Sequence, residues 1–248
     1  MLKRRLITVL TFNNGVLFRT KQFVPDYRYT LNFTDAWSVD EVALLDITRP
    51  HEGERERFYE AVELFADRCF VPLAVGGGIH TIEEVAALLR MGADKVIVNT
   101  EAFRRPSFIG EIAQLYGSQC AVVSIDAKAK DDGAYEVFVE QGRVPTGRDP
   151  ASWALEAARA GAGEILITSI EKDGSLEGYD NTLNKLVCDA VAVPVLVCGG
   201  AGNWQHFADG FKEGGASAVC TTNIYHFTEP SIKSAKEYLK NAGIDVRV

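Results

Sequence analysis

The sequence lacks a hydrophobic run long enough to cross a membrane, and it lacks an excess of basic side chains. No apolar stretch in the 248 residues reaches the roughly 18 that a transmembrane helix needs, so no membrane span is expected. Lys and Arg total 26 against 34 Asp and Glu, which leaves a net charge of −8. A chain with this balance offers no broad basic surface, and this excludes a general nucleic-acid-binding role.

Cysteine is also scarce. The five cysteines are odd in number, lie far apart and form no C-x-x-C pair, so neither a zinc site nor a disulfide framework is expected. We expect no other metal and no cofactor. The apolar run within residues 1–11 is short and leads to no small-residue cleavage site, so we interpret it as a first strand rather than a signal peptide. These features favour a reduced, cytoplasmic protein.

What the sequence does contain is an internal repeat. Val71–Ile79 and Val193–Ala201 each combine an apolar strand with a glycine cluster, and a segment of helical length follows both. Each copy then reaches a Gly-Ala pair and a second strand with a polar tip, Asn99-Thr100 in one half and Thr222-Asn223 in the other. When the two halves of the repeat are aligned, the strand that ends at Thr11 corresponds to the strand that ends at Asp126.

Short strands rich in Val, Ile and Leu alternate with helical patterns along the whole chain. Several strands show no polar alternation, which is typical of parallel strands buried on both faces. Eight such units predict one (β/α)₈ TIM barrel over residues 1–248, with half-barrels of about 1–117 and 118–248. An open doubly wound sheet is the alternative. The predicted strands are 5–11, 41–47, 71–76, 94–99, 121–126, 164–169, 193–198 and 217–222.

Helices are predicted between these strands, and two connections are long. The clearest helical patterns cover 52–68, 81–91, 106–116, 150–160, 203–213 and 229–241, with a weaker one near 31–38. The long connections, 12–32 and 127–149, occupy equivalent places in the two halves. The second is predicted to form a hairpin with Gly133 and Gly142 at its turns. Long loops at this end of a barrel are more often functional than incidental.

The glycine clusters predict two phosphate sites. Glycine lets backbone N–H groups approach an anion, and the start of the following helix adds positive potential. Two matching sites predict a phosphorylated ligand with a phosphate at each end; the alternative is that these glycines only form tight turns. The candidate residues are Gly77, Gly78, Asn99 and Thr100 in one half and Asp173, Gly174, Gly200, Thr222 and Asn223 in the other.

Asp126 is the candidate catalytic acid or base, because it ends strand five at the face where barrels carry their chemistry. The alternative is a cap for the loop that follows. The repeat places Thr11 where a second carboxylate would stand, and threonine does not titrate near neutral pH. A simple two-carboxylate mechanism on this axis is therefore not available.

Four charged residues are predicted at the opposite end of the barrel. The two-residue period of a strand puts Arg5 on the face of Thr11, Lys95 on that of Asn99, and Glu164 on that of Thr168. Glu41 would join them in a neutral ring. Charges inside a barrel need partners, so the ring is either a structural plug or a gate at an axial passage.

These motifs together resemble the HisF family, the cyclase subunit of imidazole glycerol phosphate synthase, over nearly the whole chain. The resemblance implies a barrel that takes ammonia from a HisH-like glutaminase docked at its bottom. The family's gate falls on the four charged residues, a glutaminase contact on Asp94, the phosphate motifs on the glycine clusters, and one catalytic aspartate on Asp126. The matching stretches are Leu45–Thr48, Val75–His80, Gly92–Lys95, Tyr116–Gln119, Ser124–Lys128, Gly161–Ile170, Asp173-Gly174, Gly178–Asp180, Gly199–Gly202 and His226-Phe227.

The departures from the family pattern gather at strand one. The other catalytic aspartate falls on Thr11, an Asp-Gly becomes Asn14-Gly15, and a lysine becomes Arg19. The run Gly15–Phe23 is closer to HisF paralogues of surface-polysaccharide gene clusters. That resemblance implies ammonia supply to a sugar amidotransferase. The alternatives are a working imidazole glycerol phosphate synthase and a non-catalytic scaffold that activates a glutaminase.

Overall fold

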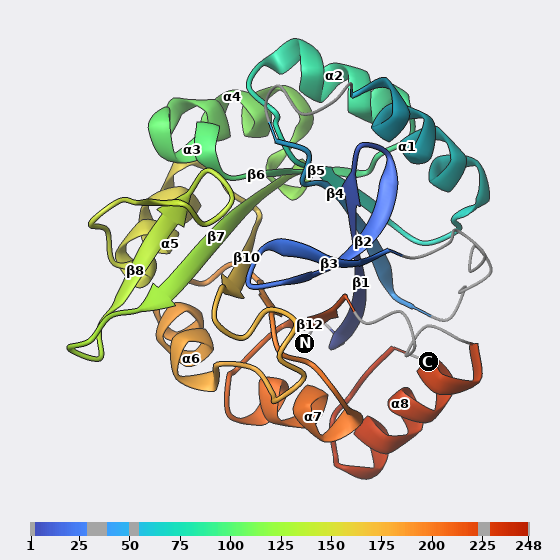
Figure 1. The fold of residues 1–248 in the computed structure, drawn as a ribbon, viewed down its shortest axis with the longest axis vertical. Coiled ribbons are helices and arrows are strands. Elements are labelled where there is room, and N and C mark those ends of the chain that lie inside the picture. Colours follow the sequence, from blue (N-terminus) through green and yellow to red (C-terminus); the bar gives the residue numbers. More distant parts are fainter. Residues whose placement is uncertain (1–2, 29–38, 50–54, 223–228, 248) are drawn as a thin grey trace.

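Eight parallel strands pair in a closed circle at the centre of the molecule (Figure 1). The computed structural model describes residues 3–28, 39–49, 55–222 and 229–247. The circle closes because β12 pairs with β1 and β10 pairs with β7. The predicted barrel is confirmed, and the open doubly wound alternative is wrong. In order the strands are β1 (Arg5–Asn13), β4 (Glu41–Asp46), β5 (Leu73–Gly76), β6 (Lys95–Val98), β7 (Ala121–Ala129), β10 (Glu164–Ser169), β11 (Val195–Cys198) and β12 (Ala218–Thr221).

Helices cover the outside of the barrel (Figure 1). Six match predicted patterns: α1 (Glu56–Arg68), α2 (Ile82–Arg90), α4 (Ser107–Tyr116), α5 (Pro150–Ala160), α7 (Trp204–Lys212) and α8 (Glu229–Asn241). The short α3 (Thr100–Arg104), the 3₁₀ turn η1 (Ser118–Cys120) and α6 (Asn181–Ala190) were not predicted. The predicted helix near 31–38 lies outside the described residues.

Local capping explains where several helices begin. The Thr81 hydroxyl accepts the Glu84 N–H, and the Glu84 carboxylate accepts the Thr81 N–H, a reciprocal pair that fixes the start of α2. Asp180 accepts the Leu183 N–H at 3.0 Å and begins α6 in the same way. Among the described residues, none of these helices combines the length and apolar character that crossing a membrane requires.

The core has two parts, because alternate side chains of each strand point outward or inward. The larger part lies between the sheet and the helices and includes Phe12, Phe58 and Trp153. The smaller part fills the lumen of the barrel. Its buried members are Ile7, Val9, Ala43, Ala74, Ile97, Val122, Leu166, Leu196, Cys198, Ala218 and Cys220.

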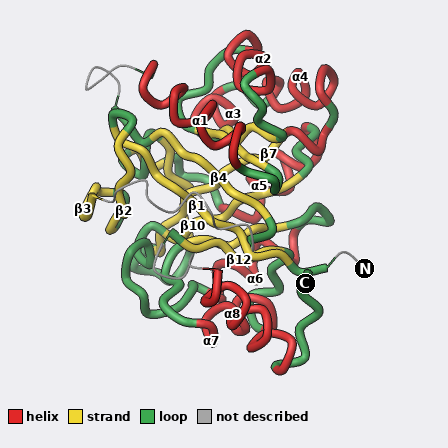
Figure 2. The backbone as a smooth tube through the Cα atoms, turned by 90° about the vertical axis from the view of Figure 1, so that its right-hand side faces the viewer, coloured by secondary structure: helices red, strands yellow, loops and turns green. Residues whose placement is uncertain are grey.

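Antiparallel extensions of β1 and β7 rise from one end of the barrel. The predicted second hairpin is confirmed: β7 continues into β8 (Tyr135–Val139) and β9 (Val144–Pro145), with Gly133 and Gly142 left-handed at the turns. The connection after β1 also forms a hairpin, β2 (Val16–Lys21) with β3 (Val24–Arg28), which was not predicted. Figure 2 shows this hairpin at one end and the C-terminal end of the chain at the other.

Candidate functional site

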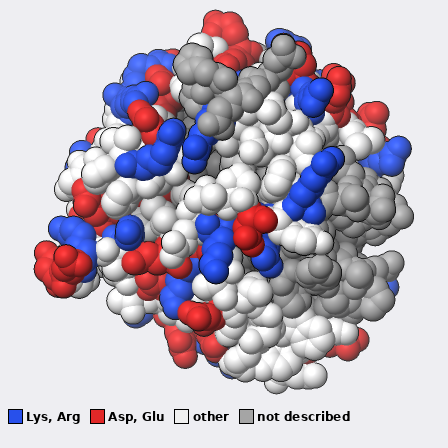
Figure 3. Space-filling model, in the orientation of Figure 1, with Lys and Arg blue, Asp and Glu red and all other residues white. Residues whose placement is uncertain are grey.

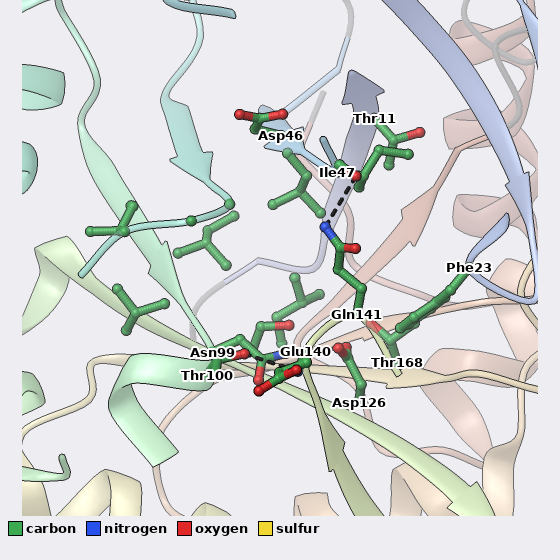
Figure 4. A pocket seen from close by; sticks show the side chains of 18 of the residues that line it. Thr11, Phe23, Asp46, Ile47, Asn99, Thr100, Asp126, Glu140, Gln141 and Thr168 are labelled. Carbon is green, nitrogen blue, oxygen red and sulfur yellow. Dashed lines mark hydrogen bonds between the residues drawn. The ribbon is translucent and has the colours of Figure 1, made fainter. Parts of the chain in front are cut away.

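A cavity of about 360 Å³ opens at the carboxyl ends of the barrel strands. Residues from several elements line it, among them Thr11, Asp46, Asn99, Asp126 and Asp173. The close-up shows how the first four of these lie (Figure 4). Basic and acidic side chains are interspersed on the face that contains the mouth (Figure 3). The mouth can therefore offer cations to a ligand without presenting one uniform charge.

Asp126 is the group in this cavity best suited to proton transfer. It lies on β7 beside Thr168 of β10, and it is only 7% exposed. The Asn99 Nδ2 atom donates to its carboxylate at 2.7 Å. Burial raises the pKa of Asp126 to about 7, the Asn99 hydrogen bond opposes the shift, and the Asp173 carboxylate adds to it. A group that titrates near neutrality can both accept and donate a proton.

Thr11 lines the same cavity, but its hydroxyl already has a partner. The β1–β2 pairing sets Thr11 against Phe18, and Thr11 Oγ1 donates to the Phe18 carbonyl at 2.5 Å. The side chain is 6% exposed. At this position the chain has a hydroxyl that holds the first hairpin in place, and no titratable group.

The first predicted phosphate site brings Gly77, Gly78 and Thr100 to the cavity wall. Both glycines have positive φ, 101° and 60°, and Arg55 donates to their carbonyl oxygens at 2.6 and 2.7 Å. The guanidinium sets a fixed positive charge beside the glycine turn. Sequence reasoning missed Arg55, because only the fold brings it to residues more than twenty positions away.

Two polar side chains of this site are engaged by other protein groups. The Asn99 amide, predicted to contact phosphate, donates to Asp126. The Thr100 hydroxyl accepts the Glu140 N–H at 3.0 Å from the turn between β8 and β9. A ligand phosphate at Thr100 would share that hydroxyl with the turn.

The second predicted site is only partly gathered at the cavity. Asp173 and Thr222 line it. Gly200 packs on Gly178, where an added Cβ would lie 2.1 Å from the Gly178 carbonyl oxygen, and a Cβ on Gly174 would lie 2.4 Å from the Thr20 carbonyl oxygen. Both glycines thus serve close packing here. Asn223 lies outside the described residues.

Asp173 also anchors the first hairpin. Its carboxylate accepts the Phe23 N–H at 3.0 Å, and its carbonyl accepts the Gln22 N–H at 3.1 Å. Burial raises the pKa of Asp173, while the Phe23 N–H lowers it. Gln22 and Phe23 are held in left-handed backbone conformations, with φ of 48° and 64°. The hairpin is therefore fixed over one side of the cavity.

The second hairpin reaches across the cavity from the other side, a feature that sequence reasoning missed. Gln141 Nε2 donates to the Ile47 carbonyl oxygen at 3.0 Å (Figure 4). Glu140 and Gln141 both have left-handed backbones, with φ of 53° and 58°. The only sequence signal was the turn at Gly142. A Cβ there would lie 2.9 Å from the Phe23 ring, so the two hairpins touch.

At the opposite end the structure brings the four predicted charges into one ring. Arg5, Glu41, Lys95 and Glu164 are each the first residue of a barrel strand. Arg5 lies 2.8 Å from Glu41 and 2.7 Å from Glu164. Lys95 lies 2.9 Å from Glu41 and 2.8 Å from Glu164. Burial raises the pKa of Glu41, while the neighbouring Lys95 lowers it.

A small void lies in the lumen between the ring and the cavity. Its volume is about 10 Å³, and Glu41, Ile7 and Ala43 are among the residues that line it. Val9, Ile97 and Leu166 line both this void and the large cavity. One layer of apolar side chains therefore lies between the void and the large cavity.

Asp94 lies at the same end as the ring, one residue before Lys95. It is exposed, and one carboxylate oxygen accepts the Leu73 N–H at 2.8 Å. Its other oxygen has room for an outside partner. Within the described part of the chain, no three His, Cys, Asp or Glu side chains gather as a metal site would require.

Comparison with known protein families agrees with this architecture. The family model described as histidine biosynthesis protein matches residues 8–230, from β1 to the start of α8. The match thus spans the barrel, the cavity and three of the four ring residues. The chain belongs to the histidine biosynthesis protein family, which includes HisF and its relatives.

Proposed function

We propose that this protein is the synthase subunit of a glutamine amidotransferase. In this proposal a HisH-like glutaminase docks at the amino-terminal face of the barrel, around the ring and Asp94. Ammonia moves through the lumen to a phosphorylated substrate at the carboxyl-terminal face. The acceptor is a sugar intermediate of surface-polysaccharide biosynthesis, transferred with the help of a sugar amidotransferase.

The observation that carries this proposal is the ring of ion pairs on the axis below the cavity. Burying four charges is costly even when they are paired, and an apolar floor would close a barrel as well. A ring of charged side chains can open when one side chain rotates about its bonds, whereas closely packed apolar side chains resist such a movement. The void of about 10 Å³ above the ring is close to the least volume that holds one water. Ammonia is of similar size.

The state of Thr11 argues for ammonia delivery rather than cyclisation. The family's ring closure uses two acids, and here only Asp126 titrates on that axis. Two other aspartates of the cavity are engaged: Asp46 accepts the Thr48 N–H at 2.9 Å and faces Arg55 at 3.6 Å, and Asp173 holds the first hairpin. Neither aspartate is free to take the place of the missing acid.

A working imidazole glycerol phosphate synthase is the second candidate, and one observation favours it. Asp126 retains a buried position and a pKa of about 7, which suits acid–base catalysis. Rescue of a histidine auxotroph by this chain would support that candidate. Failure of rescue by an expressed, folded protein would favour delivery to another acceptor.

Co-purification with a HisH-like glutaminase tests the docking step. Asp94→Asn keeps an acceptor for the Leu73 N–H but removes the charge, and it should weaken the complex. Asp131→Asn, on the exposed turn at the other end of the barrel, is the matched control and should bind normally. Equal binding by both variants would remove Asp94 from the interface, and absence of any complex would contradict the proposal.

Activity measurements distinguish a gate from a structural plug, and a synthase subunit from a scaffold. Lys95→Ala should change glutamine-dependent amidation while leaving ammonium-dependent amidation unchanged. An equal effect on both would make the ring a structural plug. Asn99→Ala should lower product formation. If Asn99→Ala left product formation and glutaminase activation both unaffected, the chain would be a scaffold that only activates the glutaminase.

A further inference from the structure

Two cysteines lie side by side in the wall of the lumen. In the pairing of β11 with β12, Val197 stands opposite Val219, so the next residues of the two strands, Cys198 and Cys220, are neighbours. Both side chains belong to the buried cluster that fills the barrel interior. Cys198 is 6% exposed and Cys220 is 1% exposed.

The two cysteines lie between the large cavity and the small void of the lumen. Cys198 lines the large cavity, and Cys220 lines the small void above the ring. They also interact directly: burial raises the pKa of the Cys220 thiol, and a hydrogen bond with the Cys198 thiol raises it further. The strand pairing and the shared lining of the barrel interior place the two side chains next to one another inside the lumen.

The strand geometry suits a covalent bond between them. Adjacent strands lie about 4.8 Å apart, and disulfides join residues whose Cα atoms are about 4.4–6.8 Å apart. The other cysteines, Cys69, Cys120 and Cys188, are partly exposed. Cys69 and Cys188 pack against the core between the sheet and the helices.

We propose that Cys198 and Cys220 are an oxidation site that forms a reversible disulfide across β11 and β12. A small peroxide entering from the cavity reaches Cys198 first. The Cys198 sulfur attacks one peroxide oxygen, the O–O bond breaks, and the thiol proton passes to the departing oxygen, so the products are a sulfenic acid and water. The Cys220 sulfur then attacks the Cys198 sulfur and displaces hydroxide, which takes up the Cys220 thiol proton to become water. With hydrogen peroxide the balance is two thiols and one peroxide to one disulfide and two waters.

This site does not depend on the proposed function, since the bond can form whatever passes through the lumen. Its position gives it a consequence for that function. The two cysteines line the lumen through which ammonia would move from the ring to the cavity. Their oxidation therefore changes the surface of this passage at its apolar layer.

Peptide mapping by mass spectrometry tests the proposal. The native protein is treated with dilute hydrogen peroxide, is unfolded in the presence of a reagent that blocks free thiols, and is digested. The expected result is a cross-linked peptide pair containing Cys198 and Cys220, lost after treatment with dithiothreitol. A variant with Cys69, Cys120 and Cys188 all changed to Ser should give the same cross-link.

The Cys198→Ser variant is the matched control and should form no intramolecular cross-link at Cys220. Two outcomes would overturn the proposal. One is a Cys198 that is oxidised to sulfinic acid while Cys220 stays a free thiol. The other is a folded, peroxide-treated wild-type protein in which both lumen cysteines remain reduced while the partly exposed cysteines react.

Discussion

The Asn99 amide donates a hydrogen bond of 2.7 Å to the Asp126 carboxylate in the lining of the cavity. The two residues come from neighbouring parallel strands, Asn99 directly after β6 and Asp126 within β7. The bond stabilises the ionised carboxylate, whereas burial favours the protonated form. Burial is the larger effect, and the balance leaves Asp126 with a pKa of about 7. This balance makes Asp126 responsive to pH near neutrality.

Asp126→Asn should stabilise the protein at high pH. The folded-state pKa of about 7 lies above the ordinary value of 3.8, so the folded state binds this proton more tightly than the unfolded state. The stabilising contribution of the Asp126 proton to the free energy of unfolding is therefore fully present below about pH 4 and is lost as the pH rises to about 7. Above that pH the free energy of unfolding no longer changes through this group. One pKa unit corresponds to roughly 1.4 kcal/mol, so the asparagine variant should exceed the wild type in free energy of unfolding at high pH by about 4 kcal/mol at most.

Urea unfolding of both proteins at about pH 8 and about pH 4 measures this difference. The gap should be present at the higher pH and close at the lower one. Asp131→Asn, which removes a surface charge, is the control. A wild-type protein as stable as the asparagine variant at about pH 8 would contradict this account of burial.

Substitutions at Thr11 should separate its hydrogen bond from the family's missing acid. Thr11→Ser keeps a donor for the Phe18 carbonyl, whereas Thr11→Val removes it and should cost about 1 kcal/mol. Thr11→Asp places a carboxylate against that carbonyl oxygen in a buried position and should cost about 2–3 kcal/mol. Denaturant midpoints give the order Ser, Val, Asp. An aspartate variant as stable as the serine variant would show that the site still accommodates the acid.

Lys95→Ala should destabilise the barrel, because it leaves Arg5 alone to balance Glu41 and Glu164. Removing one partner of a buried ion pair costs about 3–5 kcal/mol, and we expect the lower end because one cation remains. Lys185→Ala removes an exposed ion pair with Asp189 on α6 and should cost less than about 0.5 kcal/mol. Equal unfolding midpoints for these two variants would mean that the ring contributes nothing to stability.

Gly77→Ala should be far more harmful than Gly133→Ala, although both glycines have positive φ. A Cβ on Gly77 would lie 2.1 Å from the Asp46 carbonyl oxygen, while nothing lies within 4 Å of one on Gly133. We expect a loss of about 3 kcal/mol or more at Gly77 from the added clash. At Gly133 only the left-handed backbone costs energy, about 1 kcal/mol. Thermal unfolding compares the two, and similar losses would contradict the close packing of the glycine turn.

The barrel and the ring could be predicted from the sequence, because both follow from local periodicity. Apolar strands at regular spacing predict the closed sheet. Side chains that are an even number of residues apart on a strand share one face, so Arg5 points into the barrel if Thr11 does. The first hairpin was missed, since Gln22 and Phe23 adopt left-handed conformations that side chains other than glycine rarely take. Asp173, far away in sequence, holds them there.

The cavity was harder to predict than the floor of the barrel. Arg55 meets the glycine turn, and Gln141 meets Ile47, only after the chain has folded. The partner of Asn99 also depends on a side-chain orientation that periodicity does not set. Sequence pattern identified several of the residues that gather at the mouth, such as Asn99 and Asp126, but not which of them use their polar groups on one another.

The most direct test of the central claim is a turnover assay with the imidazole precursor of the HisF reaction. The purified chain is supplied with this precursor and an ammonium salt, so that no glutaminase is needed. We expect the protein to form no imidazole glycerol phosphate, because Thr11 holds the first hairpin where a second acid would act. Ordinary cyclisation under these conditions would contradict it.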